Sequence, residues 1–141
     1  MNALEKAGFL LVSVLLIAGC AVGVQSPMQP TTLKGTVTYR ERIALPPSAV
    51  VKVQLVDVSR ADAPAVVLGE QVIRAEGRQV PFAFEIAYDP KRIEARFTYA
   101  VQARIEVDGQ LRFINDQRYA VLTRGAGDRA DLLLRAVGAP R

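Results

Sequence analysis

The stretch FTYAVQARIEV, residues 97–107, places an apolar side chain at every second position along its whole length. Successive side chains of a β-strand point to opposite faces, so this alternation predicts a long strand with one buried face. Asp108-Gly109 follows directly, and this dipeptide favours the tight turn of a β-hairpin because both turn residues need a positive φ. The next residues, QLRF at 110–113, supply the returning strand. The region therefore predicts an antiparallel hairpin.

The same period of two continues on both sides of this hairpin. Val56 and Val58 shift the phase that the preceding strand residues set, which indicates a bulge or a strand end. DPKRI, residues 89–93, predicts a connection that could form one helical turn with Pro90 at its first position. Further strands are predicted at 33–39, 51–55, 66–74, 82–88, 119–123 and 130–137. This pattern predicts an all-β fold, a seven- or eight-stranded antiparallel β-sandwich of the Ig-like type, with a small barrel as the alternative.

The amino-terminal segment holds the only cysteine of the chain, Cys20. The apolar run before it, residues 7–18, is shorter than the roughly 20 residues of a membrane-spanning helix and fits a secretory signal peptide. Ile17-Ala18-Gly19-Cys20 resembles the lipobox of bacterial lipoproteins, in which a peptidase cuts between Gly19 and Cys20 and the thiol carries a diacylglycerol. The alternative is an ordinary cysteine after a conventional signal, but a lone thiol would be a liability in an oxidising compartment.

This interpretation divides the chain and gives it a location. Acyl chains such as palmitate on Cys20 would anchor the protein, since each buried methylene contributes about 0.8 kcal/mol. Ala21, rather than an aspartate, follows the cysteine. That residue favours the outer membrane, with the domain facing the periplasm. The predicted parts are a cleaved lipoprotein signal peptide at 1–19, a lipidated tether at 20–32, a β-domain at 33–137 and a tail at 138–141.

Composition excludes several kinds of chemistry. The chain has no histidine, which excludes histidine-based triads, histidine metal ligands and histidine acid–base work. Aspartate pairs such as Asp57 with Asp62 and Asp128 with Asp131 lie at turns, where they commonly bond nearby backbone. The net charge of +4 is spread along the chain. A solvated surface is the simplest interpretation, anionic headgroups or glycans are the alternative, and nucleic acid is not expected. No cofactor and no metal site are predicted.

Two sets of side chains are candidates for a binding surface. Phe113-Ile114 puts apolar residues on both faces of one strand. Either that strand is covered on both sides or it exposes an apolar patch, which would mark a partner site. The second set is the tyrosines, which all fall on apolar strand faces. They either pack in the core or line a pocket, and they are Tyr39, Tyr88, Tyr99 and Tyr119.

Several longer stretches carry a family resemblance. GTVTYRERIALPPSAVVKVQLVDVSRADAPA at 35–65, VPFAFEIAYDPKRI at 80–93, YAVQARIEVDGQLRFINDQRYAVLTRG at 99–125 and ADLLL at 130–134 resemble the YbaY family of bacterial lipoproteins. That family is grouped with YscW-type lipoproteins of type III secretion. The resemblance implies a β-sandwich on a lipid tether. Its YbaY branch has no established activity, whereas its YscW branch implies a pilotin, a lipoprotein that binds a secretin subunit and carries it to the outer membrane.

Residues and resemblance together predict a non-enzymatic envelope lipoprotein. It would be anchored through Cys20 and would bind an envelope or secretion-system protein through its β-domain. One alternative is a pilotin-like chaperone for an outer-membrane secretin, which would bind an amphipathic or disordered tail in an apolar groove. Another is a module that binds a small ligand or a glycan, and a hydrolase that uses two carboxylates is the most remote. The resemblance transfers one functional residue, Cys20, and no catalytic residue.

Overall fold

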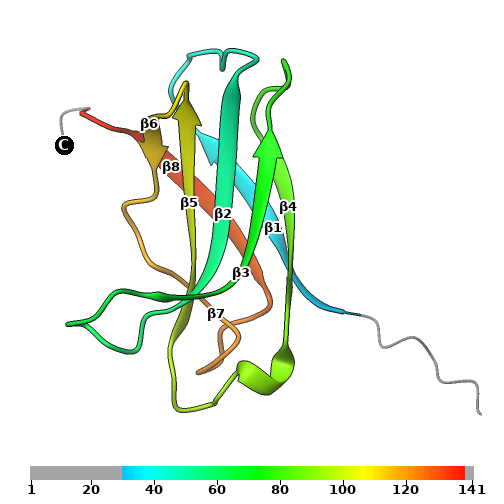
Figure 1. The fold of residues 1–141 in the computed structure, drawn as a ribbon, viewed down its shortest axis with the longest axis vertical. Coiled ribbons are helices and arrows are strands. Elements are labelled where there is room, and N and C mark those ends of the chain that lie inside the picture. The colour runs from blue at the N-terminus through cyan, green and yellow to red at the C-terminus, as the bar shows by residue number, and fades with distance from the viewer. Residues whose placement is uncertain (1–29, 139–141) are drawn as a thin grey trace, which may run out of the picture.

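A computed structural model describes residues 30–138 of the chain (Figure 1). It contains eight strands and one short 3₁₀ helix, η1. Over these residues, no helix has the length and apolar character that a membrane crossing requires. The elements are β1 (Thr31–Tyr39), β2 (Ala49–Asp57), β3 (Val66–Arg74), β4 (Phe82–Tyr88), η1 (Pro90–Arg92), β5 (Tyr99–Val107), β6 (Gln110–Ile114), β7 (Tyr119–Val121) and β8 (Arg129–Ala136).

The strands form two layers that are joined along one side. Figure 1 shows β3, β2, β5 and β6 in front, with β8, β1 and β4 crossing behind them. Hydrogen bonds connect all of these strands in the order β3-β2-β5-β6-β8-β1-β4. The remaining strand, β7, lies off this path and pairs with the first three residues of β5, whereas β6 pairs with its last four. The joint between the layers is short, because β6 meets β8 only at Phe113 and Ile114. The result is an all-β, nearly closed, barrel-like sheet.

This arrangement confirms the all-β prediction and corrects its finer detail. The predicted sandwich was antiparallel throughout, but β1 and β8 run parallel, from Lys34 opposite Arg129 to Tyr39 opposite Leu134. The predicted Ig-like sandwich had two separate sheets, whereas β6 belongs to both layers here. The physical reason is that a period of two reports which side chains share a face. It carries no information about which strands are neighbours or which way they run.

Side-chain contacts rather than a backbone ladder close the other side, between β3 and β4. The backbone N–H of Glu85 donates to Oε1 of Gln71 at 2.6 Å. Gly69 allows the closest approach, since a Cβ built there would lie 2.7 Å from the carbonyl oxygen of Ala87 and 2.6 Å from Ile86 Cγ2. This seam therefore depends on one amide side chain and on one residue without a side chain.

The core lies between the two layers and is apolar. No polar or charged residue is fully buried within residues 30–138. Burying one large aliphatic or aromatic side chain stabilises a fold by about 1.5–3 kcal/mol. The largest side chains buried almost completely are Tyr99, Leu33, Leu55, Ile86, Ile105, Leu132 and Leu134.

Several local predictions are confirmed. The register between β2 and β3 shifts between Leu55 and Val56, where the sequence indicated a bulge or a strand end. Asp108 and Gly109 have φ values of 52° and 79°, as the hairpin turn between β5 and β6 requires. Asp89 caps η1 by accepting a hydrogen bond from the backbone N–H of Lys91, and Pro90 opens the helical turn.

Candidate functional site: a surface at the end of β6 and β8

The predicted partner residues lie on opposite faces of β6. Phe113 is 4% exposed and stacks on Tyr39, with ring centroids 4.2 Å apart and an interplanar angle of 13°. Ile114 is 43% exposed on the outer face. The predicted lipidation and cleavage residues, Gly19 and Cys20, lie outside the described residues. Of the two partner residues, Ile114 therefore offers free apolar surface, while Phe113 belongs to the core cluster.

A bulge in β6 sets this arrangement. Phe113 pairs with Ile105 of β5, whereas Leu111 pairs with the next residue, Glu106, so Arg112 is the extra residue. A bulge of this kind bends the strand and redirects its side chains. Leu111 is 40% exposed on the same strand. The bulge therefore lets a five-residue strand put one aromatic ring in the core and present apolar side chains outside.

Exposed apolar side chains gather where β6, β8 and the β1–β2 loop meet. Single exposed apolar residues are normal on a protein surface, and a group of them is informative. The backbone N–H of Val137 donates to the carbonyl oxygen of Arg112 at 2.9 Å, which holds the end of β8 against β6. The group consists of Ile43 (59% exposed), Ile114 (43%) and Val137 (52%), because Val137 shares one hollow with Ile43 and another with Ile114.

An apolar groove opens between the β1–β2 loop and the end of β8, with a volume of about 340 Å³. We call it the β6–β8 groove. Phe113 lies at its base and Arg112 at its edge. The loop side is fixed by Gln79, whose Oε1 accepts from the N–H of Leu45 at 2.7 Å and whose Nε2 donates to the carbonyl of Leu45 at 3.0 Å. The apolar lining consists of Ile43, Ala44, Leu45, Pro46, Val107, Phe113, Ala136 and Val137.

A second, wider hollow lies beside the same strand end. It shares Ala136 and Val137 with the groove, so the two lie next to each other. Oε1 of Glu41 accepts from the N–H of Ala136 at 3.1 Å, and this backbone hydrogen bond is the main reason that the pKa of Glu41 lies below its usual value. Arg135 pairs with Asp116 at 2.7 Å across the hollow. Glu41 therefore anchors the end of β8.

Three arginines give this surface a positive edge. Arg40 lines the second hollow, Arg112 lines the groove, and Arg42 immediately precedes Ile43. All three are exposed, and none takes part in an ion pair within residues 30–138. Their charge is therefore available to a partner.

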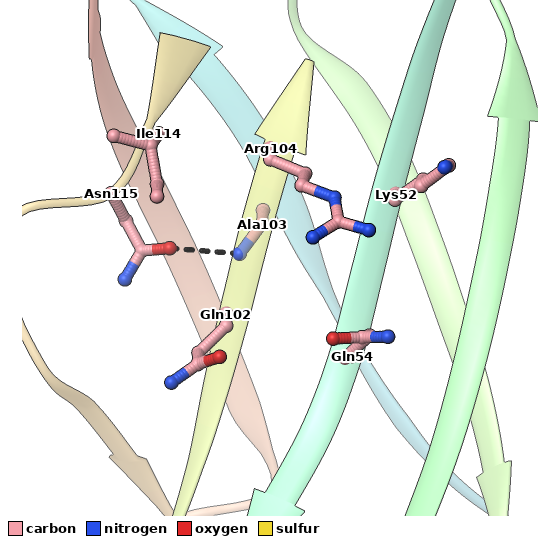
Figure 2. A pocket seen from close by; sticks show the side chains of 7 residues that line it. All are labelled: Lys52, Gln54, Gln102, Ala103, Arg104, Ile114 and Asn115. Atoms are coloured by element: carbon pink, nitrogen blue, oxygen red, sulfur yellow. Dashed lines mark hydrogen bonds between the residues drawn. The ribbon is translucent and has the colours of Figure 1, made fainter. Parts of the chain in front are cut away.

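A third hollow lies on the outer face of β2 and β5 (Figure 2). It lies beside a gap in the pairing along β5, because β6 pairs with the end of β5 and β7 pairs with its beginning, and the segment between β6 and β7 pairs with neither part. Oδ1 of Asn115 spans this gap by accepting from the N–H of Ala103 at 2.8 Å. Glu106 contacts Lys52 at 2.9 Å and Arg104 at 3.0 Å, and the hydrogen bond from Lys52 is the main cause of its lowered pKa. Polar side chains dominate its lining, and no tyrosine contributes to it.

The tyrosines pack in or against the core, as the simpler interpretation predicted. The hydroxyls of Tyr39, Tyr99 and Tyr119 bond to the backbone of a neighbouring loop or strand, and no tyrosine lines any of the three hollows. Tyr39 donates to the carbonyl of Ile43 at 2.6 Å, which holds the loop that carries the groove wall. Tyr99 accepts from the N–H of Glu94 at 2.9 Å, and Tyr119 accepts from the N–H of Leu133 at 2.9 Å. The tyrosine-lined pocket that a glycan-binding module would need is not formed by these side chains.

Two of the aspartates that the sequence singled out, Asp57 and Asp131, bond to nearby groups in the described part of the chain. Asp57 accepts from the backbone N–H of Ser59, the local bond expected at a strand end. Asp131 accepts from Thr36 at 2.9 Å and pairs with Arg129 at 3.0 Å. Within residues 30–138, no group of three or more acidic or cysteine side chains is placed to hold a metal ion.

Sequence reasoning missed most of the groove. Ile43 and Val137 were not candidates, although each carries a signal. Ile43 stands between charged residues and a diproline loop, and Val137 follows the end of the alternation in β8. An apolar residue that the strand pattern does not bury is the signal that could have identified them.

Comparison with known proteins places this geometry in a family. The sequence model of the family described as "Type III secretion system lipoprotein chaperone (YscW)" matches residues 28–134. The chain belongs to the YscW family. This membership confirms the resemblance seen in the sequence, and the matched range includes β1 to β7 and most of β8.

Two relatives of this YscW-family chain are informative. It is 40% identical over 110 residues to "Uncharacterized lipoprotein YbaY" of Escherichia coli K12, a match that covers 78% of the chain and 57% of that relative. The chain thus spans less than two thirds of that lipoprotein. It is also 50% identical to a solved "alternative pilotin from the type II secretion system of Vibrio cholerae", with a TM-score of 0.74, covering 77% of the chain and 98% of the pilotin. Lipoprotein relatives imply a bacterial envelope location.

Proposed function

We propose that the chain is a lipid-anchored, pilotin-like chaperone that binds a secretin subunit of a secretion system. The observation that carries this proposal is the match to the Vibrio cholerae pilotin. Half of the aligned residues are identical, and the match covers 98% of that chain. A shared fold alone would not transfer a function, because one fold supports many functions. Identity at this level over the whole of the related domain is stronger support.

The anchor is the second part of the proposal. The lipobox residues Ile17-Ala18-Gly19-Cys20 supply the attachment point, and cleavage would leave lipidated Cys20 as the new amino terminus. Several acyl chains together hold a protein in a membrane, whereas a single chain binds only marginally. Ala21 supports transport to the outer membrane, with the domain in the periplasm. A bound partner would then travel with the anchor.

The mechanism needs binding but no chemical step. A chaperone of this kind covers an apolar segment of its client and so prevents that segment from associating elsewhere. The exposed apolar residues at the end of β6 and β8 supply such a surface. We expect no enzymatic activity and no cofactor.

The test is to follow the secretin in a strain that lacks this protein. We expect wild-type protein to restore secretin multimers in the outer-membrane fraction of a density gradient. Cys20→Ser should abolish incorporation of labelled palmitate and leave the secretin in the inner membrane. Ala21→Asp is the matched control, since it keeps the lipid and should hold both proteins in the inner membrane. Normal secretin localisation in the deletion strain would refute the chaperone role, and normal anchoring of Cys20→Ser would refute the lipid anchor.

A further inference from the structure

We propose that the end of the domain next to η1 contacts the phospholipid headgroups of the membrane in which the protein is anchored. The inference depends on the lipid anchor of the proposed function, and it does not depend on a secretin partner. The contact surface consists of the loops at 58–65, 89–98 and 122–128 together with the start of β3. We call it the tether-end surface.

The chain enters the domain at this surface. Thr31, the first residue of β1, pairs with Tyr88 at the end of β4, and the loop that contains η1 follows directly. Residues 21–30 lie between Thr31 and the proposed lipid on Cys20, and a chain of that length spans at most about 35 Å. A short linker gives an effective concentration in the millimolar range, so even a weak contact with the membrane surface is well populated.

Strand pairing brings the three loops to the same end of the domain. Asp57 at the end of β2 pairs with both Val66 and Tyr99, the first residues of β3 and β5. Tyr99 also pairs with Val121 at the end of β7. The loop before β3, the loop before β5 and the loop after β7 are therefore neighbours, and Figure 1 shows η1 and β7 at the lower end of the molecule.

Hydrogen bonds join these loops to one another. Oγ of Ser59 accepts from the N–H of Thr98 at 2.9 Å, which joins the first loop to the second. Nη2 of Arg124 donates to the carbonyl of Arg96 at 3.1 Å, which joins the third loop to the second. The surface is therefore preformed, and contact with a membrane needs little further ordering.

Five exposed basic side chains lie on the tether-end surface. Arg96 pairs with Glu94 at 2.9 Å, and the other four take part in no ion pair within residues 30–138. A guanidinium binds phosphate oxygens in a planar, bidentate geometry, and basic residues close to an anionic membrane are attracted to it. The five residues are Arg60, Lys91, Arg92, Arg96 and Arg124.

Acidic residues at the same end limit this attraction to short range. Asp57 accepts from the N–H of Ser59 at 2.8 Å and Asp89 from the N–H of Lys91 at 2.9 Å, so both carboxylates are engaged within the domain. The acidic residues, equal in number to the basic ones, are Asp57, Asp62, Asp89, Glu94 and Asp128. A surface without a large net charge exerts little attraction beyond a Debye length. It would therefore recruit no acidic protein from solution, whereas the anchor already holds the membrane beside it.

Two exposed valines add apolar surface beside these charges. Val66 and Val67 begin β3 and are 55% and 44% exposed. Cationic and apolar side chains next to each other are typical of surfaces that lie in the headgroup layer. Val72 on the same strand is 48% exposed and pairs with Lys52 in the middle of β2. Positions 66 and 72 are about 20 Å apart along the strand, so Val72 is a matched control.

The first experiment measures contact with lipid at these two valines. Lipidated protein, in which Cys20 is acylated, carries Val66→Cys or Val72→Cys with a fluorophore on the new thiol. The vesicles contain phosphatidylethanolamine and phosphatidylglycerol, with a short-range quencher attached to some of the headgroups. We expect a severalfold higher quenching constant at position 66 than at position 72. Equal quenching, or stronger quenching at position 72, would overturn the proposal.

The second experiment tests whether the arginines hold the contact. Quenching at position 66 is compared in the wild-type background, in Arg60→Glu/Arg92→Glu and in Arg42→Glu/Arg112→Glu. Both double variants change the net charge equally, and none of the four side chains takes part in an ion pair within residues 30–138. Arg42 and Arg112 lie at the opposite end, in the β1–β2 loop and beside the groove. We expect only the tether-end variant to lose most of its quenching, and equal loss in both, or no loss in the tether-end variant, would contradict the assignment.

Salt provides a test that needs no charge substitution. Attraction between exposed arginines and phosphates weakens as ionic strength rises. Quenching at position 66 should therefore fall as salt is added, towards the level at position 72. Quenching that does not change with salt would overturn the role of the basic side chains.

The outcomes also separate this inference from the proposed function. Protein that carries no lipid would refute the anchor and, with it, this inference. Lipidated protein without quenching at position 66 would refute the membrane contact and leave the anchor standing. Normal secretin localisation in the deletion strain would refute the chaperone role, and quenching at position 66 in vesicles that contain no secretin would still support the membrane contact.

Discussion

Gly35 is the residue with the least freedom to change, because it lies where β1 and β8 run parallel. A Cβ built at Gly35 would lie 1.7 Å from the carbonyl oxygen of Ala130 and 2.7 Å from Phe84 Cζ. The nearest atom is backbone, so a rotamer change cannot relieve the overlap. We expect Gly35→Ala to lower the free energy of unfolding in urea by about 3 kcal/mol or to prevent folding. Gly127→Ala, where no atom lies within 4 Å, is the control and should change stability little.

Phe113 and Ile114 differ in role although they are adjacent. Removing a buried aromatic ring typically costs about 3–5 kcal/mol, and Phe113 also supports Tyr39. Ile114→Ala removes side-chain surface that is already 43% exposed. We expect Phe113→Ala to unfold at much lower urea concentration and Ile114→Ala to unfold near the wild type. Similar destabilisation by both substitutions would contradict the assignment of one face to the core.

At the scale of elements, β3 and β4 are joined by Gln71. Its side-chain oxygen accepts a hydrogen bond from the backbone N–H of Glu85 in β4. The substitution Gln71→Ala removes this acceptor. We expect hydrogen exchange at Glu85 to accelerate by about tenfold. Gln71→Glu keeps an acceptor and should restore much of the protection. Gln54→Ala, in which the lost side chain pairs β2 with Glu70, should leave exchange at Glu85 unchanged.

The parallel pair β1–β8 makes stability depend on pH. The hydrogen bond from Thr36 is the main cause of the lowered pKa of Asp131, and Arg129 adds to it. A carboxyl whose pKa is lower in the folded state contributes stability above its unfolded pKa, near 4, and loses that contribution as pH falls through the folded pKa. We therefore expect Asp131→Asn to flatten the loss of stability below about pH 4, measured by urea unfolding. Asp62→Asn, at an exposed loop residue, should leave the acid limb unchanged.

The element scale also shows how far the sequence predicts this molecule. Alternation located nearly all strands, and residues 66–74 and 82–88 match β3 and β4 at both ends. Alternation could not reveal that β8 runs parallel to β1, because that pairing joins residues such as Gly35 and Ala130 from opposite ends of the domain. The groove escaped prediction for the same reason. Its walls come from three separate segments, and of its lining residues only Phe113 was a candidate from the sequence.

At the scale of the whole molecule, β1 separates the tether side from the groove side. Thr31 begins β1 and pairs with Tyr88, so η1 lies at that end. Tyr39 ends β1 at the opposite end, where the β1–β2 loop forms the groove wall (Figure 1). Nine residues of strand span about 30 Å. If the chain is anchored through Cys20, it enters the domain at the η1 end and presents the groove away from the lipid.

This polarity can be measured by energy transfer from single labelled thiols to an acceptor lipid. Cys20 is the only native cysteine and is proposed to carry lipid, so Lys91→Cys in η1 or Val137→Cys at the groove gives one reactive thiol in the mature protein. In vesicles that hold the lipidated protein, we expect more efficient transfer from position 91 than from position 137, because the entry of the chain keeps the η1 end nearer the membrane. Adding Cys20→Ser and labelling the thiol at 91 or 137 of the released domain should abolish transfer from both positions. Greater transfer from position 137 would mean that the groove faces the lipid, where a partner segment arriving from the periplasm could not reach it, and equal transfer would mean that the domain has no preferred polarity; either result would contradict this prediction.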